Sequence, residues 1–320
     1  MFVQEGSAHH QADSEGWSLF GAPTGSDSIK ISHAVNFYRA GALGNRTQLL
    51  TANSMVEAAA FSRDIQLLAV VQENEKDAAP QSFGIAPPLR RTVADVRQFA
   101  ATRPFPLLFD ILENAAAGAQ PGSYLIFTNS DICLAPNFYR AVRSILARGV
   151  DCLIINRRTV AQLESFGEAP ELAVLEVGSA HPGFDCFVFP TAWVQDFVTN
   201  AACVGIGWVM RSLLYNLAVK ARRMVILRDA HLTYHYGDDR PWNAPELEEY
   251  TRHNLGEARL VVRALSDDPA KREALNEFCA AHGEYGTEIF ATGQSKGRPV
   301  TLSKIAKKIA GWSGRGTRSR

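Results

Sequence analysis

The sequence has few cysteines and no pattern that would join them. Its five cysteines are odd in number, lie mostly among apolar residues and show no CxxC spacing. This excludes a disulfide framework and a cysteine-rich zinc site, and it favours a reduced, cytoplasmic protein. The chain also lacks any apolar run near the ~20 residues that cross a bilayer. Residues 1–17 lack the basic start and apolar centre of a secretory signal, in agreement with a cytoplasmic location.

Net charge is absent as well, because 33 basic residues balance 33 acidic ones. Eight of the basic residues and none of the acidic ones lie in residues 296–320, which leaves 25 basic against 33 acidic residues elsewhere. Residues 301–312 place Leu302, Ile305 and Ile309 on one face of a short basic helix, which suits a peripheral contact with the anionic inner membrane surface. A merely solubilising tail is the alternative. The acidic body argues against nucleic acid as a partner.

What is present is the composition of an ordinary globular protein. Hydrophobic residues make up 46% and charged residues 21% of the chain, which is enough apolar material for a sizeable core. Residues 1–27 are polar, rich in small residues and without periodicity, so we expect them to be disordered. We expect one domain over residues 28–292 and a basic tail over residues 293–320.

Apolar runs and helix-forming runs alternate through the first part of the chain. A strand within residues 28–41, a helix at 53–63 and a strand at 65–72 predict a parallel βαβ unit. Later residues continue the α/β pattern with short strands and amphipathic C-terminal helices. The expected elements are helices at 93–101, 106–119, 136–148 and 203–222, strands at 124–127, 150–158, 184–190 and 224–227, and helices within 245–282.

The most informative stretch is the end of the strand at residues 124–127. This apolar run is followed by Thr128-Asn129-Ser130-Asp131, a polar cluster where open α/β sheets place their ligands. Asn129 and Asp131 are two residues apart, so in extended chain both side chains project to the same side. A carboxylate and an amide oxygen suit a hard divalent cation that carries a diphosphate. A helix-capping turn is the alternative, since the same residue types are favoured there.

This strand end resembles the metal-binding strand end of GT-A-fold glycosyltransferases, with Asn129-Ser130-Asp131 in place of their Asp-x-Asp motif. The resemblance covers roughly residues 28–255. It implies a GT-A-like (Rossmann-like) α/β fold with a mostly parallel central sheet flanked by helices. It also implies transfer of a sugar from a nucleotide-diphosphate sugar to a hydroxyl acceptor, such as a glycan or a lipid-linked precursor, assisted by Mn²⁺ or Mg²⁺. Residues 28–158 would be the nucleotide-binding half, and 159–292 the acceptor half with the C-terminal helices.

The resemblance also implies which residues contact the donor. Asp131 would hold the metal, and Asn129 would orient the ribose or the phosphates. Side chains at the ends of the first two strands would contact the base and ribose, and two arginines would lie near the diphosphate, because a guanidinium binds phosphate with two hydrogen bonds. Alternatively, the two arginines are solvated surface residues and Asp110 is an exposed helix residue. The further donor-binding candidates are His33, Asn36, Gln72, Arg90, Arg91 and Asp110.

A late histidine completes the metal site in a number of GT-A enzymes, and His235 matches it here. With Asp131 it would form a mixed imidazole and carboxylate site. His231 is the competing candidate, and a structural, hydrogen-bonded histidine is the alternative reading of His235. Gly237 would be the hinge of a loop that acts as a lid.

Asp185 is the candidate catalytic base. It lies between Phe184 and Phe187, and burial there would raise the pKa of its carboxyl group. Such a carboxylate would accept the proton of the acceptor hydroxyl as the sugar is transferred. Glu176 is a second candidate for the base. Alternatively, Asp185 is a structural aspartate in a turn. The tryptophans Trp193, Trp208 and Trp242 are candidates for stacking on a sugar, or else core residues.

Two other functions remain open at this stage. A nucleotidyltransferase also grips a metal and phosphates at strand ends, but it would need a glycine-rich loop near the first strand, and residues 40–45 (AGALGN) match one only weakly. A catalytically degenerate donor-binding or scaffolding protein of the same fold is the non-enzyme alternative. Asn129 favours it, because it replaces one of the two motif carboxylates.

Overall fold

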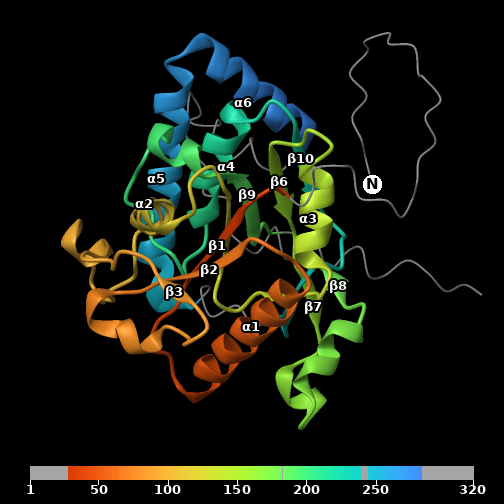
Figure 1. The fold of residues 1–320 in the computed structure, drawn as a ribbon. Helices are drawn as coiled ribbons and strands as arrows, with labels where there is room; N and C mark the ends of the chain where they lie inside the picture. The colour runs from red at the N-terminus through yellow and green to blue at the C-terminus, as the bar shows by residue number, and fades with distance from the viewer. Residues whose placement is uncertain (1–27, 182, 239–243, 283–320) are drawn as a thin grey trace, which may run out of the picture. The chain divides into compact units, whose positions relative to one another are not determined.

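The computed structural model describes residues 28–181, 183–238 and 244–282, and its centre is a seven-stranded sheet (Figure 1). All neighbouring strands in it are parallel except the pairs that β9 makes, which are antiparallel. The expected α/β class with a mostly parallel central sheet is therefore confirmed. In spatial order the strands are β10 (Met224–Leu227), β6 (Cys152–Ile155), β9 (Cys186–Pro190), β4 (Tyr124–Thr128), β1 (Ile31–Asn36), β2 (Ile65–Val70) and β3 (Gly84–Ile85).

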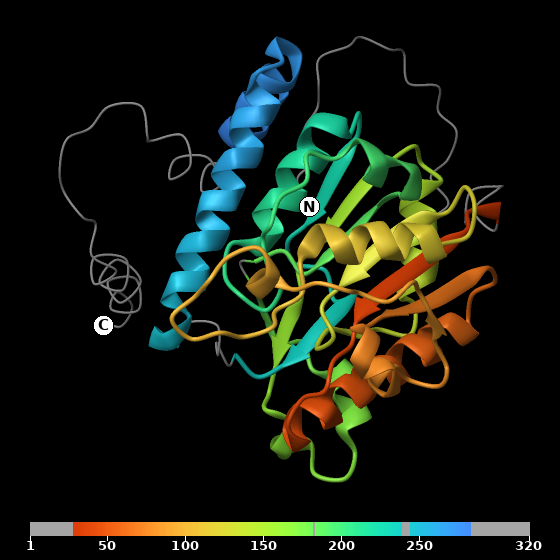
Figure 2. The ribbon, with the colours of Figure 1, turned by 90° about the vertical axis from the view of Figure 1, so that its left-hand side faces the viewer.

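Helices cover both faces of this sheet (Figures 1 and 2). On one face, α1 and α3 share a core with side chains of β1, β4 and β9. On the other face, Phe109 of α2 contacts Phe197, which in turn contacts Phe189 of β9, and α5 packs along α4. The helices are α1 (Ala42–Ala60), α2 (Leu108–Gly118), α3 (Phe138–Leu146), α4 (Val209–Lys220), α5 (Glu248–Ser266) and α6 (Pro269–His282). The short 3-10 helices are η2 (Glu73–Ala78), η3 (Val93–Asp95), η4 (Leu163–Phe166), η5 (Pro170–Leu175), η6 (Thr191–Asp196) and η8 (Pro245–Leu247).

The central strands are apolar along their whole length because helices bury both of their faces. In β4, Ile126 joins the core under α1 and α3, while Leu125 and Phe127 point to the opposite face. All three are fully buried, and each such side chain stabilises the fold by about 1.5–3 kcal/mol. The resulting frame holds the polar residues that follow β4 in a fixed position.

A second, four-stranded sheet lies beyond the carboxyl ends of the central strands. Tyr234 and Tyr236 of its strand β11 form a small separate core with Cys133 and Val160. Because side chains alternate along a strand, His235 then faces the other way. In spatial order the strands are β5 (Cys133–Leu134), β11 (Thr233–Tyr236), β7 (Arg158–Val160) and β8 (Ser179–Ala180).

Three expected elements differ from the structure. The helix expected at 53–63 is α1, which already begins at Ala42. The helix expected at 93–101 is only the single turn η3, closed by hydrogen bonds between Thr92 and Asp95. The strand expected at 150–158 is two strands, since β6 ends at Ile155 and the chain then enters β7 of the second sheet. The amphipathic helices expected within 245–282 are α5 and α6.

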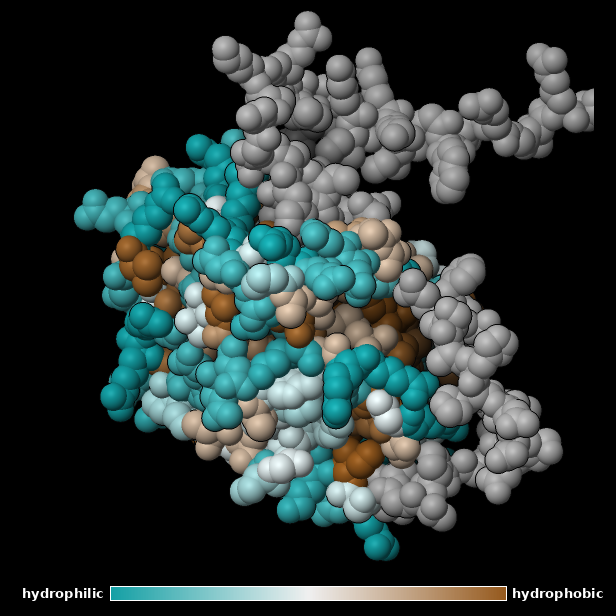
Figure 3. All heavy atoms as spheres, turned by 90° about the horizontal axis from the view of Figure 1, so that it is seen from above, coloured by the Kyte–Doolittle hydropathy of each residue, from teal (hydrophilic) through white to brown (hydrophobic). Residues whose placement is uncertain are grey.

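The compact unit that contains both sheets extends to Phe278. The expected domain end at 292, the N-terminal segment 1–27 and the basic tail 293–320 lie outside the described residues. Among the helices of the described part, none is both long and apolar enough to span a bilayer. Seen from above, the surface is mostly hydrophilic, with hydrophobic residues in small patches between polar ones (Figure 3).

His33 corrects an expectation about the donor pocket. It was expected just beyond the first strand, but β1 continues to Asn36 and encloses the imidazole completely. The imidazole nitrogens make hydrogen bonds of 2.8 Å with the Tyr139 hydroxyl and 3.0 Å with the Thr128 hydroxyl. Burial lowers the pKa of His33 to about 3. His33 is therefore a neutral core residue that ties β1 to β4 and α3.

This burial predicts a pH-dependent stability. Below pH 6.5 the unfolded chain protonates His33 while the folded chain does not, so stability falls with pH until about pH 3. We expect His33 to cost about 2 kcal/mol of unfolding free energy between pH 6.5 and pH 4.5. Urea titrations at these two pH values should show a smaller loss for His33→Gln, which keeps hydrogen-bonding groups but does not titrate. An equal loss in both proteins would contradict the assignment.

Candidate donor and metal site

Polar side chains gather at one edge of the central sheet. β1, β2, β4 and β6 run parallel and end at this edge, and the antiparallel β9 begins there. In the strand register, Cys186 lies opposite both Thr128 and Ile155, so the residues next to these three meet between β4 and β6. These neighbours are Asn129, Asp185 and Asn156. The edge where parallel strands end is the ligand-binding edge of open α/β sheets.

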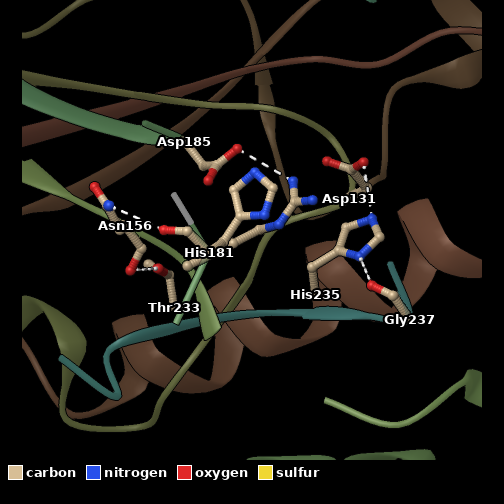
Figure 4. A network of polar contacts seen from close by, with 8 residues as sticks. Asp131, Asn156, His181, Asp185, Thr233, His235 and Gly237 are labelled. Atoms are coloured by element: carbon tan, nitrogen blue, oxygen red, sulfur yellow. Dashed lines mark hydrogen bonds and ion pairs between the residues drawn. The ribbon is translucent and has the colours of Figure 1, made fainter. Parts of the chain in front are cut away.

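Asp131 and His235 meet because the second sheet brings them together. β11 pairs antiparallel with β5, with Tyr234 opposite Cys133, which places His235 next to the residues that precede β5. The His235 Nε2 atom lies 3.2 Å from Asp131 Oδ2, and Nδ1 lies 2.9 Å from the carbonyl oxygen of Gly237. Figure 4 shows the imidazole between these two oxygens. Since a carbonyl only accepts, Nδ1 carries the proton and Nε2 faces the carboxylate.

Two acceptors that face each other need a proton or a cation between them. Bonds of about 2.1 Å at a right angle place two metal ligands about 3 Å apart, close to the 3.2 Å seen here. The second oxygen of Asp131 and the amide oxygen of Asn129 are buried and have no hydrogen-bond partner in the part of the chain that the structure describes. Burial raises the pKa of Asp131, but the hydrogen bond and charge of His235 and the charge of Arg157 outweigh it, so the net shift is downward. A cation that displaces the proton between His235 Nε2 and Asp131 would therefore meet an ionised carboxylate and an imidazole lone pair, a donor set that fits a divalent cation.

In the described residues no group of three or more His, Cys, Asp or Glu side chains could hold a metal. The candidate site accordingly offers one carboxylate and one imidazole, with the amide of Asn129 nearby. A cation held there would keep other coordination positions for a substrate.

Asp185 forms a buried ion pair with Arg157. Arg157 Nη1 lies 3.1 Å from Asp185 Oδ1, and the two side chains are only 2% and 8% exposed. Burial raises the pKa of Asp185; Arg157 opposes this shift, Asp131 adds to it, and the net direction is upward. Asp185 is thus buried as expected, and the direction of its pKa shift agrees with the expectation. The alternative of a simple turn aspartate does not fully describe this residue, because its carboxylate also pairs with a buried arginine.

The strongest sign of a binding site is a concentration of buried polar atoms without partners. Folded proteins pair nearly all such atoms, so exceptions need an explanation. Of nine unpartnered buried side-chain atoms in the part of the chain that is described, six lie in this one cluster. They are Asn129 Oδ1, Asp131 Oδ1, Asn156 Oδ1, Arg157 Nε, Arg157 Nη2 and Asp185 Oδ2. A polar ligand bound at this edge would satisfy them.

The donor-side candidates lie on the β1–β2 side of the same edge. Asn36 ends β1 and donates a hydrogen bond of 2.8 Å to the carbonyl oxygen of Val70. Gln72 follows β2, forms a bridge to Leu89 and has a buried, unpartnered Nε2. The amide group of Gln72 is therefore available to a ligand, whereas that of Asn36 already joins two strands.

The arginine candidates are arranged differently from what the sequence suggested. Arg91 and Asp110, expected separately to contact the donor, bind each other through two hydrogen bonds of 2.7 Å. Arg90 is exposed beside them, in an open cavity of ≈ 340 Å³ that Glu113 and Asn114 also line. Arg91 is thus committed to Asp110, whereas Arg90 makes no hydrogen bond or ion pair within the described residues.

Several competing candidates have structural roles. Both carboxylate oxygens of Glu176 accept hydrogen bonds from the Ala161 backbone N–H, at 3.2 and 3.1 Å, so this side chain anchors a loop. The pKa of His231 is lowered by burial and by Arg158, and His235, not His231, contacts Asp131. Trp242 lies outside the described residues.

Sequence reasoning missed Asn156 and Arg157. Both follow a buried strand, which is the same signal that singled out Asn129 and Asp131. They were overlooked because residues 150–158 read as one uninterrupted strand, whereas the chain leaves the central sheet after Ile155.

No known protein-family model matches the chain, and no curated protein matches it. Among solved structures, S. aureus TarS in complex with UDP-GlcNAc is 14% identical with a TM-score of 0.48, over 88% of this chain and 79% of that one. A mannosyltransferase from Pyrobaculum calidifontis in complex with GDP-Man and Mn²⁺ is 13% identical with a TM-score of 0.48, over 89% and 81%. Glucosyl-3-phosphoglycerate synthase from Mycobacterium tuberculosis, with Mn²⁺ and UDP, is 14% identical with a TM-score of 0.44, over 78% and 85%. At these identities and TM-scores, no property of those proteins is carried over to this chain.

Proposed function

We propose that the chain is a GT-A-type glycosyltransferase that moves a sugar from a nucleotide-diphosphate sugar to a hydroxyl acceptor. The observation that carries this proposal is the cluster of unpartnered buried polar atoms around the Asp131–His235 pair. The cluster lies at the ligand-binding edge of the sheet, and it includes a site that fits a divalent cation. The nucleotide-sugar donor follows from the resemblance of the strand end that carries Asn129 and Asp131.

Asp131 and His235 would hold Mn²⁺ or Mg²⁺, and Asn129 would orient the donor's ribose or phosphates. When bound, the cation would act as a Lewis acid that stabilises the leaving diphosphate. The Gly237 carbonyl holds Nδ1 of His235 and thereby keeps the Nε2 lone pair directed at the site. Gln72 and Arg90 lie on the β2 side of the same edge and are the candidates for contact with the nucleotide.

Asp185 is the proposed base for the acceptor hydroxyl. It lies between the ends of β4 and β6, on the side of Asp131 away from β1 and β2. A base works best when its pKa approaches the working pH, and burial raises the pKa of Asp185 in that direction. Arg157 fixes one oxygen of the carboxylate, so the other oxygen is free to accept a proton.

One observation favours the alternative that the chain is a catalytically degenerate, donor-binding protein. Asn129 stands where the Asp-x-Asp motif has a carboxylate, which lowers the negative charge available to a cation. Such a protein would bind nucleotide without turnover. A peripheral contact of the basic tail with an anionic membrane stays a prediction, as residues 293–320 lie outside the described part.

Thermal unfolding with UDP or GDP, with and without Mn²⁺, tests the proposal. A nucleotide at 100 times its Kd would stabilise the fold by about 2.7 kcal/mol, or roughly 4–5 °C in Tm for a chain of this size. We expect such a shift for one of the two nucleotides, larger with Mn²⁺ and reduced by EDTA. A sugar-nucleotide hydrolysis assay then separates enzyme from binding protein. No shift with any nucleotide would exclude the enzyme, and a shift without turnover would favour the degenerate alternative.

A further inference from the structure

The guanidinium group of Arg157 uses only one of its edges. Its Nη1 atom donates to Asp185 Oδ1 at 3.1 Å. Its Nε and Nη2 atoms are buried and have no partner among the described residues, and the whole side chain is only 2% exposed. A permanently charged group is thus held in the interior with two of its donors unsatisfied. Leaving buried donors of a charged group unpaired is costly.

The unpaired atoms are the two that grip an oxyanion side by side. Nε–H and Nη2–H lie on the same edge of the planar guanidinium and match the two oxygens of a carboxylate or phosphate. Arg91 uses this edge for the carboxylate of Asp110, and Arg39 uses it for Asp77. Arg158 fills the same edge with the carbonyl oxygens of Val177 and Gly178. Arg157 differs from these three because no oxygen of the described part of the chain accepts a hydrogen bond from that edge.

The position of Arg157 identifies which part of the reaction it serves. Along the carboxyl edge, the strands lie in the order β6, β9, β4, β1, β2. Arg157 follows β6, the proposed metal ligand Asp131 follows β4, and the nucleotide side lies at β1 and β2. Arg157 is therefore beyond the metal site, on the side of the proposed base Asp185, where the acceptor must bind.

We propose that the free edge of Arg157 binds a carboxylate or phosphate group of the acceptor. This inference rests on the proposed glycosyltransferase function. Because Nη1 of the same rigid group holds Asp185, the bound oxyanion lies next to the proposed base. The acceptor is then a hydroxy acid or a phosphate ester whose reacting hydroxyl is close to its anionic group. A neutral acceptor would leave the charged edge of Arg157 without a partner.

The donor's own diphosphate is the other possible source of an oxyanion, and a titration with inorganic phosphate distinguishes the two. Calorimetry on the full chain measures phosphate binding without nucleotide and again with saturating UDP and Mg²⁺. We expect phosphate to bind in both conditions with similar affinity, since the acceptor subsite is separate from the donor subsite. Phosphate binding that UDP abolishes would overturn the acceptor assignment and would place the donor's phosphate at Arg157.

The variants are chosen so that Nη1 of Arg157 keeps a hydrogen-bond acceptor and so that Asp185 never stays charged without Arg157. Asp185→Asn keeps a hydrogen-bond acceptor for Nη1 and should bind phosphate at least as well as the natural chain, as a nearby negative charge is lost. The double variant Arg157→Gln/Asp185→Asn should bind phosphate about tenfold more weakly, or worse, than Asp185→Asn. Arg222→Gln is the matched control, since Arg222 is 94% exposed and should leave binding unchanged.

Equal phosphate affinity in the double variant and in Asp185→Asn would overturn the oxyanion site. A loss of binding in Arg222→Gln as large as in the double variant would overturn it too, because the effect would then be one of general charge. A chain that binds phosphate through Arg157 but binds no nucleotide would refute the proposed function, and the acceptor assignment with it. The oxyanion site itself would stand in that case.

Discussion

The Asp131→Asn variant is expected to lose metal-dependent sugar-nucleotide turnover by at least about 100-fold. The substitution keeps the shape of the side chain but removes the charge that faces the lone pair of His235 Nε2. An amide would donate to that nitrogen instead and so occupy the lone pair that a cation requires. Turnover measured against Mn²⁺ concentration is the readout, and we expect a raised Mn²⁺ requirement together with a lower maximum.

Asn129→Asp is the matched control for this experiment. It restores the second motif carboxylate at a position whose amide oxygen is buried and unpartnered. We expect this variant to keep activity and to need less Mn²⁺, because a second carboxylate adds negative charge beside a cation. His235→Gln should behave like Asp131→Asn. Full Mn²⁺-dependent activity in Asp131→Asn would refute the metal assignment while leaving the fold intact.

The edge of the sheet was predictable from local pattern. An apolar run followed by a polar cluster marks the end of a buried strand, and this rule located Asn129 and Asp131 correctly. The partner of Asp131 is 104 residues away in the chain. No rule based on residue spacing covers so large a separation. His235 was identified as a candidate only through the resemblance to GT-A enzymes. The contact depends on how β11 pairs with β5, which is a property of the tertiary structure.

The misplaced residues show where the pattern stops being informative. His33 was taken for a loop residue because strand ends are hard to locate in a run that mixes apolar and polar residues. Tertiary packing against Tyr139 and Thr128 supplies the partners that let an imidazole stay inside β1. Arg91 and Asp110 were recognised separately. They lie 19 residues apart in the chain, so the sequence did not show that they pair with each other. Arg157 was missed because the sequence indicated one continuous strand, whereas the chain leaves the central sheet after Ile155.

Asp185→Asn is expected to lower the rate of sugar transfer by about 10²–10⁴-fold, the usual contribution of a general base. The amide cannot accept the proton of the acceptor hydroxyl, although it can still accept the hydrogen bond from Arg157 Nη1. In the natural chain, kcat should rise with pH through the pKa of Asp185, which lies above the ordinary 3.8. The variant should lack this rise, while its affinity for UDP and Mn²⁺ should change little.

Stability should move in the opposite direction to activity in this variant. The raised pKa means that the folded chain binds a proton more tightly than the unfolded chain, so ionisation of Asp185 costs stability as pH rises above 3.8. Asp185→Asn removes that cost. Its stability relative to the natural chain should therefore improve between pH 4 and pH 7, as followed by urea unfolding. If Asp185 only held Arg157 in place, the variant would instead unfold more easily at pH 7 and keep its transfer rate.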